Sequence, residues 1–207
     1  MRINIPYWRQ RSDFTCDPAV LMMAMKFFKP KLKLSKELEF EIWRESYGIG
    51  ISGCMPQGLA VSALNRGFHA TMICRKVGWF ECSRKIAKNG TKWSQETTIL
   101  TSKSLFKKAK KLGMDVIDRD PGIKDIEDAI RKRYVPLIMI NAGVLYGDDS
   151  PHWVVVTGIE GKKAWINDPI GKKIAKNYMV SVRDLEKMIN DLKTKSRINK
   201  RILIVSR

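Results

Sequence analysis

The sequence predicts an α+β fold, with helices first and an antiparallel sheet after them. Predicted helices fill most of the chain up to Gly67, and predicted strands dominate from Val135 onward. Elements of one kind that cluster along the chain are typical of α+β proteins, whereas α/β proteins alternate helices with strands. A length of 207 residues suits one domain with its own core, so we expect residues 1–207 to form a single domain.

The predicted N-terminal helices follow an extended segment at residues 5–9, and each has recognisable end signals. Pro18 suits the first turn of the first helix, where a missing N–H costs nothing. Ser35 can cap the second helix, Pro56 opens the third, and Gly67 stops it. Apolar residues recur at helical spacing in all three. We expect these helices at about residues 16–28, 36–47 and 56–66.

The remaining predicted elements are mainly strands. Alternating or continuous apolar runs predict them, and Glu160-Gly161 is a plausible hairpin turn. The expected strands lie at residues 68–74, 135–141, 153–159, 164–167 and 202–205, with helices at about 123–133 and 182–192. Residues 75–113 contain a polar loop around Asn89-Gly90 and a lysine-rich helix near 103–112, and we expect this stretch to be an insertion or a peripheral segment.

The net charge, the apolar runs and the cysteine spacing limit the classes of protein to which this chain can belong. The net charge is +18, which favours an anionic partner such as nucleic acid, although a lysine-rich solvated surface explains it equally well. No apolar run reaches the length of a membrane span, and the start lacks the apolar centre of a signal peptide, so we expect a cytoplasmic protein. The four cysteines lack paired C-x-x-C spacing, which argues against zinc, and we expect no metal and no cofactor.

One cysteine lies at a position that favours a reactive thiolate. Cys16 lies at the point where an extended loop enters an apolar helix, so backbone N–H groups and the positive helix end favour its thiolate. Gln10 is six residues upstream and could fold its amide back beside the sulfur, where an N–H would stabilise an oxyanion. The structural alternative makes Cys16 a small buried residue and Gln10 a surface residue.

A histidine and an aspartate complete the pattern. His152 heads an apolar strand, where a neutral imidazole can take the proton of a nearby thiol. Asp168 ends the following strand, and a hairpin returns it to the start of the first, where it could fix the imidazole tautomer. Alone, His152 also fits a strand-end surface residue and Asp168 a turn residue before proline.

In this joint pattern the sequence resembles the bacteriocin-processing, double-glycine leader peptidases, a family of papain-like cysteine peptidases. The resemblance covers most of the chain apart from roughly residues 75–113. The matching pieces run in family order: Gln10 and Thr15-Cys16-Asp-Pro-Ala-Val-Leu21; Gly50-Ile-Ser52, Gly58-Leu59 and Gly67-Phe68-His-Ala70; Val135-Pro136-Leu-Ile; His152-Trp-Val-Val-Val; and Asp168-Pro169 with Gly171.

The resemblance implies a papain-like fold, with N-terminal helices packed on a C-terminal antiparallel sheet, and a peptide or protein substrate. It implies that Cys16 is the nucleophile, that His152 is the general base and acid, and that Asp168 orients the imidazole. Gln10 and the backbone N–H of Cys16 would then donate to the oxyanion.

One residue departs from the family pattern. The family usually has glycine after the cysteine, and this chain has Asp17, whose charge opposes thiolate formation. Three functions therefore compete: hydrolysis of a peptide or isopeptide bond, transfer of an acyl or γ-glutamyl group through the same acyl-enzyme, and a weak or inactive module that binds a polyanion.

Overall fold

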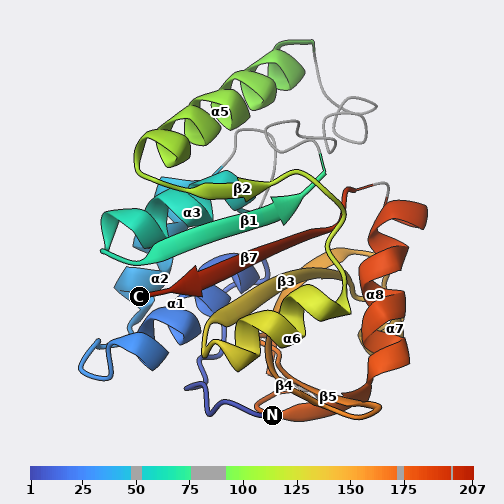
Figure 1. The fold of residues 1–207 in the computed structure, drawn as a ribbon. Coiled ribbons are helices and arrows are strands. Elements are labelled where there is room, and N and C mark those ends of the chain that lie inside the picture. The colour runs from blue at the N-terminus through green and yellow to red at the C-terminus, as the bar shows by residue number, and fades with distance from the viewer. Residues whose placement is uncertain (48–52, 76–91, 172–174, 197) are drawn as a thin grey trace.

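The computed structural model describes residues 1–47, 53–75, 92–171, 175–196 and 198–207 (Figure 1). The predicted polar loop around Asn89-Gly90, the family-matching segment Gly50-Ile-Ser52 and Cys82 lie outside the described residues. Within them, no helix has both the length and the apolar character that crossing a bilayer requires.

The described strands form one mixed sheet (Figure 1). They are β1 (His69–Cys74), β2 (Asp115–Ile117), β3 (Val135–Asn141), β4 (Pro151–Glu160), β5 (Lys163–Asn167), β6 (Tyr178–Ser181) and β7 (Arg201–Ser206). Their order across the sheet is β2-β1-β7-β3-β4-β5-β6. Central β3 is buried along its whole length, as its continuous apolar sequence predicts.

The sheet differs from the expected one at its β2 edge. β1 and β2 pair in parallel, while every other neighbouring pair is antiparallel. Helix α5 (Lys92–Lys111) lies between β1 and β2 in the chain, and parallel neighbours require such a crossover connection. The sheet is therefore neither wholly antiparallel nor confined to the C-terminal part, although the α+β class holds.

The other helices cover the sheet. In Figure 1, α1 lies behind the strands and α6 lies in front of them. The described helices besides α5 are α1 (Cys16–Phe28), α2 (Lys36–Ser46), α3 (Pro56–Asn65), α6 (Ile123–Arg131), α7 (Gly143–Tyr146) and α8 (Val182–Thr194). Every predicted helix is present, and α5 begins well before the predicted start near residue 103.

Helix α1 is the centre of the core. Its residues from Asp17 to Met25 are all buried, because the helix packs against the sheet on one side and against α2 and α3 on the other. A helix that is apolar all round is stable only in such an enclosed position. The packing of α1 on β4 fixes the N-terminal end of α1, and with it Cys16, close to the start of that strand.

The first residues of the chain run along the outer part of β4. Ile3 N donates to Thr157 O at 2.8 Å, and Arg2 forms an isolated bridge with Gly158. A Cβ on Gly158 would come within 2.5 Å of the Arg2 side chain, so glycine permits this close approach. The N-terminal segment is thereby carried toward the beginning of α1.

Candidate functional site

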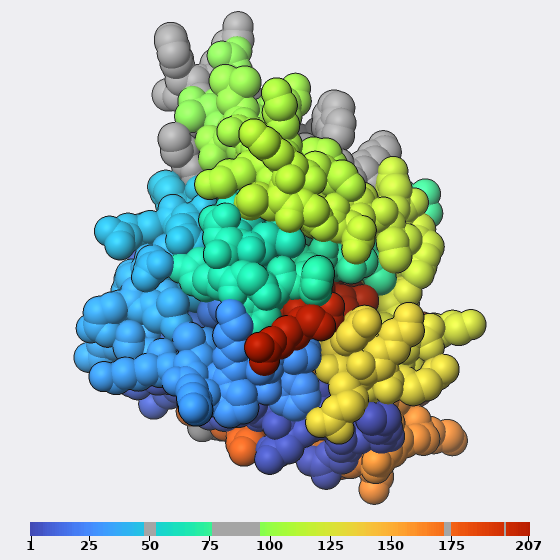
Figure 2. All heavy atoms as spheres, turned by 60° about the vertical axis from the view of Figure 1, so that its left-hand side comes forward, coloured from blue at the N-terminus to red at the C-terminus, as the bar shows by residue number. Residues whose placement is uncertain are grey.

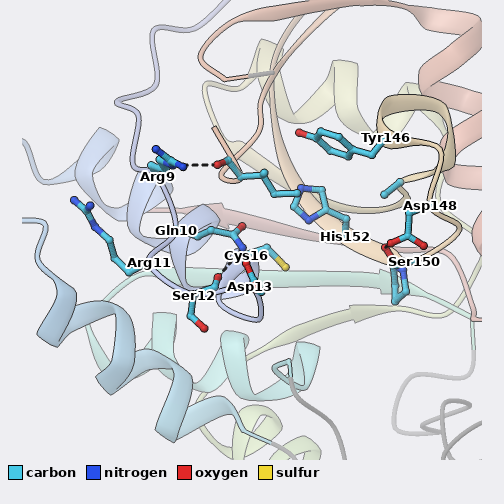
Figure 3. Close-up of a pocket in the computed structure, with 13 residues that line it drawn as sticks. Arg9, Gln10, Arg11, Ser12, Asp13, Cys16, Tyr146, Asp148, Ser150 and His152 are labelled. Atoms are coloured by element: carbon cyan, nitrogen blue, oxygen red, sulfur yellow. Dashed lines mark hydrogen bonds between the residues drawn. The ribbon is translucent and has the colours of Figure 1, made fainter. Parts of the chain in front are cut away.

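Three of the four predicted site residues line one cavity of about 490 Å³. Cys16 comes from the start of α1, Gln10 from the loop before it, and His152 from the start of β4. Figure 3 draws these three side chains close together. The fourth, Asp168, follows β5 and lies behind His152, because the β4–β5 hairpin returns the chain to its starting edge.

Cys16 begins α1 and is partly exposed. The backbone N–H groups of Trp153 and Asp17 donate to its sulfur, which favours the thiolate. Desolvation by the surrounding protein, followed by the charge of the Asp17 carboxylate, outweighs these donors and raises the pKa of the Cys16 thiol well above its ordinary value. This environment favours the protonated thiol over the thiolate.

Asp17 is a fixed neighbour of that thiol. Its side chain is buried, and its Oδ2 accepts from Cys16 Sγ at 3.6 Å and from the backbone N–H of Cys54 at 3.3 Å. Burial raises the pKa of Asp17 from 3.8 to about 6, and the Cys54 N–H donor partly offsets that rise. The departure from the family pattern thus places a titratable carboxyl group in contact with the candidate nucleophile.

His152 and Asp168 form a buried pair. His152 Nε2 lies 3.0 Å from Asp168 Oδ1, and both side chains are almost fully enclosed. A carboxylate only accepts hydrogen bonds, so Nε2 carries the proton. The imidazole Nδ1 is then free to accept a proton from a group in the cavity.

Asp168 is held by more than His152. Its Oδ1 also accepts from the backbone N–H of Ile170 at 2.9 Å, and its Oδ2 accepts from the Tyr146 hydroxyl at 2.9 Å. Burial, followed by the Asp168 charge, raises the pKa of the Tyr146 hydroxyl, so it stays a donor. Tyr7 donates to the Asp168 backbone carbonyl at 2.9 Å. These contacts fix the positions of both Asp168 carboxylate oxygens. The His152 imidazole, which is bonded to one of them, is thereby held in one orientation.

Gln10 reaches the cavity from the neighbouring loop. Its Nε2 donates one hydrogen to Ser12 O at 2.7 Å, and its buried Oε1 has no partner among the described residues. An amide nitrogen carries two hydrogens, so one N–H remains available to an oxyanion. The first-turn N–H groups of α1 are a second source, since the N-cap residue Thr15 makes no side-chain cap hydrogen bond.

A buried glutamate anchors the loop that carries Gln10. Glu39 of α2 is fully buried, and its carboxylate accepts from the Trp8 indole and from the backbone N–H of Arg11 at 2.7 Å. On the other side, Gln10 N donates to Pro169 O at 2.9 Å. The loop is thus bound both to α2 and to the segment that carries Asp168.

The other described cysteines and the second histidine do not line the cavity. Cys54 and Cys74 are buried, and His69 is exposed at the start of β1. No cluster of three potential metal-ligating side chains is found in the part of the chain that the structure describes.

Sequence reasoning missed several residues that hold the site. Tyr7 lies in the extended N-terminal segment and Tyr146 in the short helix α7, which was not predicted, and no pattern linked either residue to Asp168. Glu39 gave a weak signal, because an acidic residue in the first turn of a helix is ordinarily explained by the helix dipole. Its burial and its partners depend on a loop some thirty residues away.

The arrangement can support nucleophilic chemistry. A thiol and an imidazole share one cavity, the imidazole is oriented by a carboxylate, and amide donors flank the sulfur. These are the parts that acyl transfer through a cysteine requires.

Comparisons with known proteins show what the fold and the sequence are similar to. Two solved structures share the fold: a double-glycine motif protease from an AMS/PCAT transporter, in complex with its leader peptide, and a C39-like peptidase from Bacillus anthracis. The first is 17% identical, has a TM-score of 0.50, and the match covers 99% of this chain and 93% of that one. The second is 14% identical, has a TM-score of 0.51, and the match covers 100% and 98%.

At the sequence level, no curated protein matches the chain. A family model described as the Peptidase C39-like family matches residues 5–201, a range that includes all four predicted site residues. The papain-like architecture is shared with both solved structures. The chain therefore belongs to the Peptidase C39-like family.

Proposed function

We propose that this protein is a cysteine peptidase that cleaves a peptide or isopeptide bond through an acyl-enzyme on Cys16. The observation that carries the proposal is the buried pair of His152 and Asp168, with Nε2 and Oδ1 3.0 Å apart, beside the cavity that Cys16 lines. A histidine oriented in this way has its other nitrogen available to a thiol.

The chemistry follows from these positions. His152 Nδ1 takes the proton from Cys16, and the thiolate attacks the substrate carbonyl carbon. The second N–H of Gln10 and the N–H of Cys16 stabilise the oxyanion. The imidazolium then gives its proton to the leaving amine, which leaves a thioester on Cys16. Water, deprotonated by His152, attacks the thioester and releases the acid and the thiol.

The substrate class is a peptide or protein segment that can enter an open cavity. The structural relative from the AMS/PCAT transporter was solved with its leader peptide, which supports a peptide substrate here. The cavity presents Arg9 and Arg11 at one end and Asp148 at the other in the view of Figure 3, so charged side chains on both sides of the scissile bond would find partners.

The test is cleavage of a proteome-derived peptide library, followed by mass spectrometry of the new termini. The wild-type protein should produce recurrent cleavage sites, and the Cys16→Ala and His152→Ala variants should not. Circular dichroism of both variants controls for folding. Library peptides that remain intact with wild-type protein across pH 5–8, or equal cleavage by Cys16→Ala, would refute the proposal.

Transfer is the second candidate, because the same thioester serves both reactions. Adding excess amine acceptors to the library distinguishes the two outcomes. Amine conjugates that accumulate faster than free acids would identify a transferase, whereas free acids alone would identify a hydrolase.

A further inference from the structure

Four cations gather at the end of α1 that lies farthest from Cys16. They are Lys26, Lys29, Arg133 and Arg207, and we refer to them as the basic end. Figure 2 looks onto this side of the molecule and shows the loop after α1, the end of α6 and the end of β7 side by side. Chain segments distant in sequence thus bring positive charge to one place.

The contacts of α1's last turn define the basic end. Arg207 donates to Phe28 O at 3.2 Å, and the Arg133 guanidinium lies 5.9 Å from the centre of the Phe27 ring. Lys29 Nζ lies 4.5 Å from the centre of the Phe68 ring. Each cation is therefore held against the protein surface by a carbonyl oxygen or by an aromatic face.

None of the four cations has a carboxylate partner among the ion pairs of the described residues. Some arginines and lysines elsewhere in those residues do pair with acids, as Arg66 does with Glu41 and Glu45. The C-terminal end of a helix attracts cations, which accounts for Lys26 and Lys29 at the end of α1 and for Arg133 just after α6. Arg207 comes from the end of β7, so three separate elements contribute to the basic end.

Arg133 occupies a backbone position that disfavours it. Its φ is +59°, in the left-handed region, and it follows α6 as part of a Schellman motif: Arg133 N donates to Ile130 O and Tyr134 N donates to Ala129 O. Glycine is the usual residue at this position, because a side chain there costs conformational energy. The arginine is exposed and makes no ion pair in the described structure, so its guanidinium is available to a partner outside the fold.

We propose that the basic end binds the phosphodiester backbone of a nucleic acid. Guanidinium forks and ammonium groups recognise phosphate oxygens, and cations without acidic partners keep their full charge for that purpose. Phe27 is only partly exposed, Phe68 is buried, and both rings have a cation near their faces, so they do not provide the apolar anchor that stable binding to a lipid surface requires.

The proposed surface is independent of the cavity. Cys16 is at one end of α1 and Phe28 at the other, and a helix of 13 residues is about 20 Å long. A nucleic acid on the basic end would therefore leave the cavity open to a substrate. The inference stands or falls separately from the peptidase proposal.

The experiment measures binding of the full chain to labelled single-stranded and duplex DNA of about 20 nucleotides, by fluorescence anisotropy between about 50 and 200 mM salt. Wild-type protein should bind, with affinity falling linearly on a log–log salt plot. The variant Arg133→Gly/Arg207→Gln should bind about fivefold more weakly or worse at 100 mM salt, and its salt slope should decrease by about 0.7–0.9 for each lost phosphate contact. Arg133→Gly restores the preferred residue, so this change should not impair folding.

The matched control is Lys103→Gln/Lys107→Gln, which removes the same charge from the exposed face of α5. Full binding by this control would support a local surface, whereas an equal loss would show that net charge alone attracts DNA and would overturn the proposal. Absence of DNA binding at the lowest salt would also overturn it. Vesicles containing anionic phospholipid are the third probe, and binding to them without binding to DNA would replace the proposed partner with a membrane surface.

Discussion

The Asp17 carboxylate contacts the Cys16 thiol, with Oδ2 and Sγ 3.6 Å apart. It is anchored there by the backbone N–H of Cys54, so the contact is part of the folded structure. A negative charge at this place opposes formation of the thiolate on which the proposed reaction depends.

Replacing Asp17 with Asn should make Cys16 more reactive at neutral pH. The change keeps a side-chain oxygen for the Cys54 N–H and removes the charge that raises the Cys16 pKa. We expect alkylation by iodoacetamide at pH 7 to be about tenfold faster, which corresponds to a fall of one unit in thiol pKa. Peptide mapping gives the rate, with buried Cys74 as an internal reference. An unchanged alkylation rate would mean that burial alone, and not the Asp17 charge, keeps Cys16 protonated.

The same carboxyl should make stability depend on pH. The Asp17 pKa is raised from 3.8 to about 6, so the folded state keeps this proton in a range where the unfolded state loses it. The stabilisation that the protonated Asp17 contributes is therefore complete below about pH 4. It is lost as the pH rises through 6, which lowers the free energy of unfolding by up to about 3 kcal/mol.

Urea unfolding at pH 4.5 and pH 7.5 measures this effect when wild type is compared with Asp17→Asn, because all other carboxyl groups are common to both. The stability of Asp17→Asn relative to wild type should increase between the two pH values. A constant difference would contradict the raised pKa.

Tyr146→Phe should weaken the orientation of His152 without touching the cavity thiol. The variant removes the hydroxyl that donates to Asp168 Oδ2, which leaves more negative charge on the carboxylate. We expect a loss of about 1–3 kcal/mol in unfolding free energy and a change in the NMR chemical shifts of the His152 imidazole at constant pH. Unchanged imidazole shifts together with lower stability would assign Tyr146 a purely structural role.

Gln10→Ala should reduce turnover with little change in KM. Loss of an oxyanion donor typically lowers kcat by about 10²–10³. The Gln10 Oε1 has no partner in the described structure, so the stability cost should be small. The substrate found in the peptide library serves for the assay. A large rise in KM with normal kcat would assign Gln10 to substrate binding.

Gly58→Ala should destabilise the contact between α2 and α3. A Cβ at this position would lie 2.5 Å from the Ser46 Cα, and backbone atoms cannot move aside cheaply. Overpacking of this kind typically costs about 1–3 kcal/mol. Gly122→Ser is the matched control, since a Cβ there meets nothing within 4 Å and serine suits the N-cap of α6. Thermal unfolding should separate the two variants.

The sequence predicted elements with long apolar patterns well, and it predicted the short edge strands and the start of polar α5 poorly. β3 and α1 carry long apolar patterns, and their predicted ranges agree with the structure. β2 and β6 have three and four residues at the two edges of the sheet and show no clear alternation. The parallel pairing of β1 and β2 was missed for the same reason, although a helix between two short apolar runs is the pattern of a crossover.

The predicted site residues come together because the hairpin of β4 and β5 brings Asp168 to His152. The contacts that refine the site were beyond sequence reasoning. The position of Tyr146 depends on the four-residue helix α7, and that of Gln10 depends on buried Glu39. Such contacts join segments far apart in the chain, which local periodicity cannot reveal.

The order in which the site residues occur along the chain has a consequence for synthesis. α1 with Cys16 emerges from the ribosome before β4, on which it packs, and His152 follows Cys16 by more than 130 residues. The nascent chain cannot assemble the His152–Asp168 pair until the β4–β5 hairpin has formed, so a peptidase of this design would remain inert toward its own unfinished chain during translation.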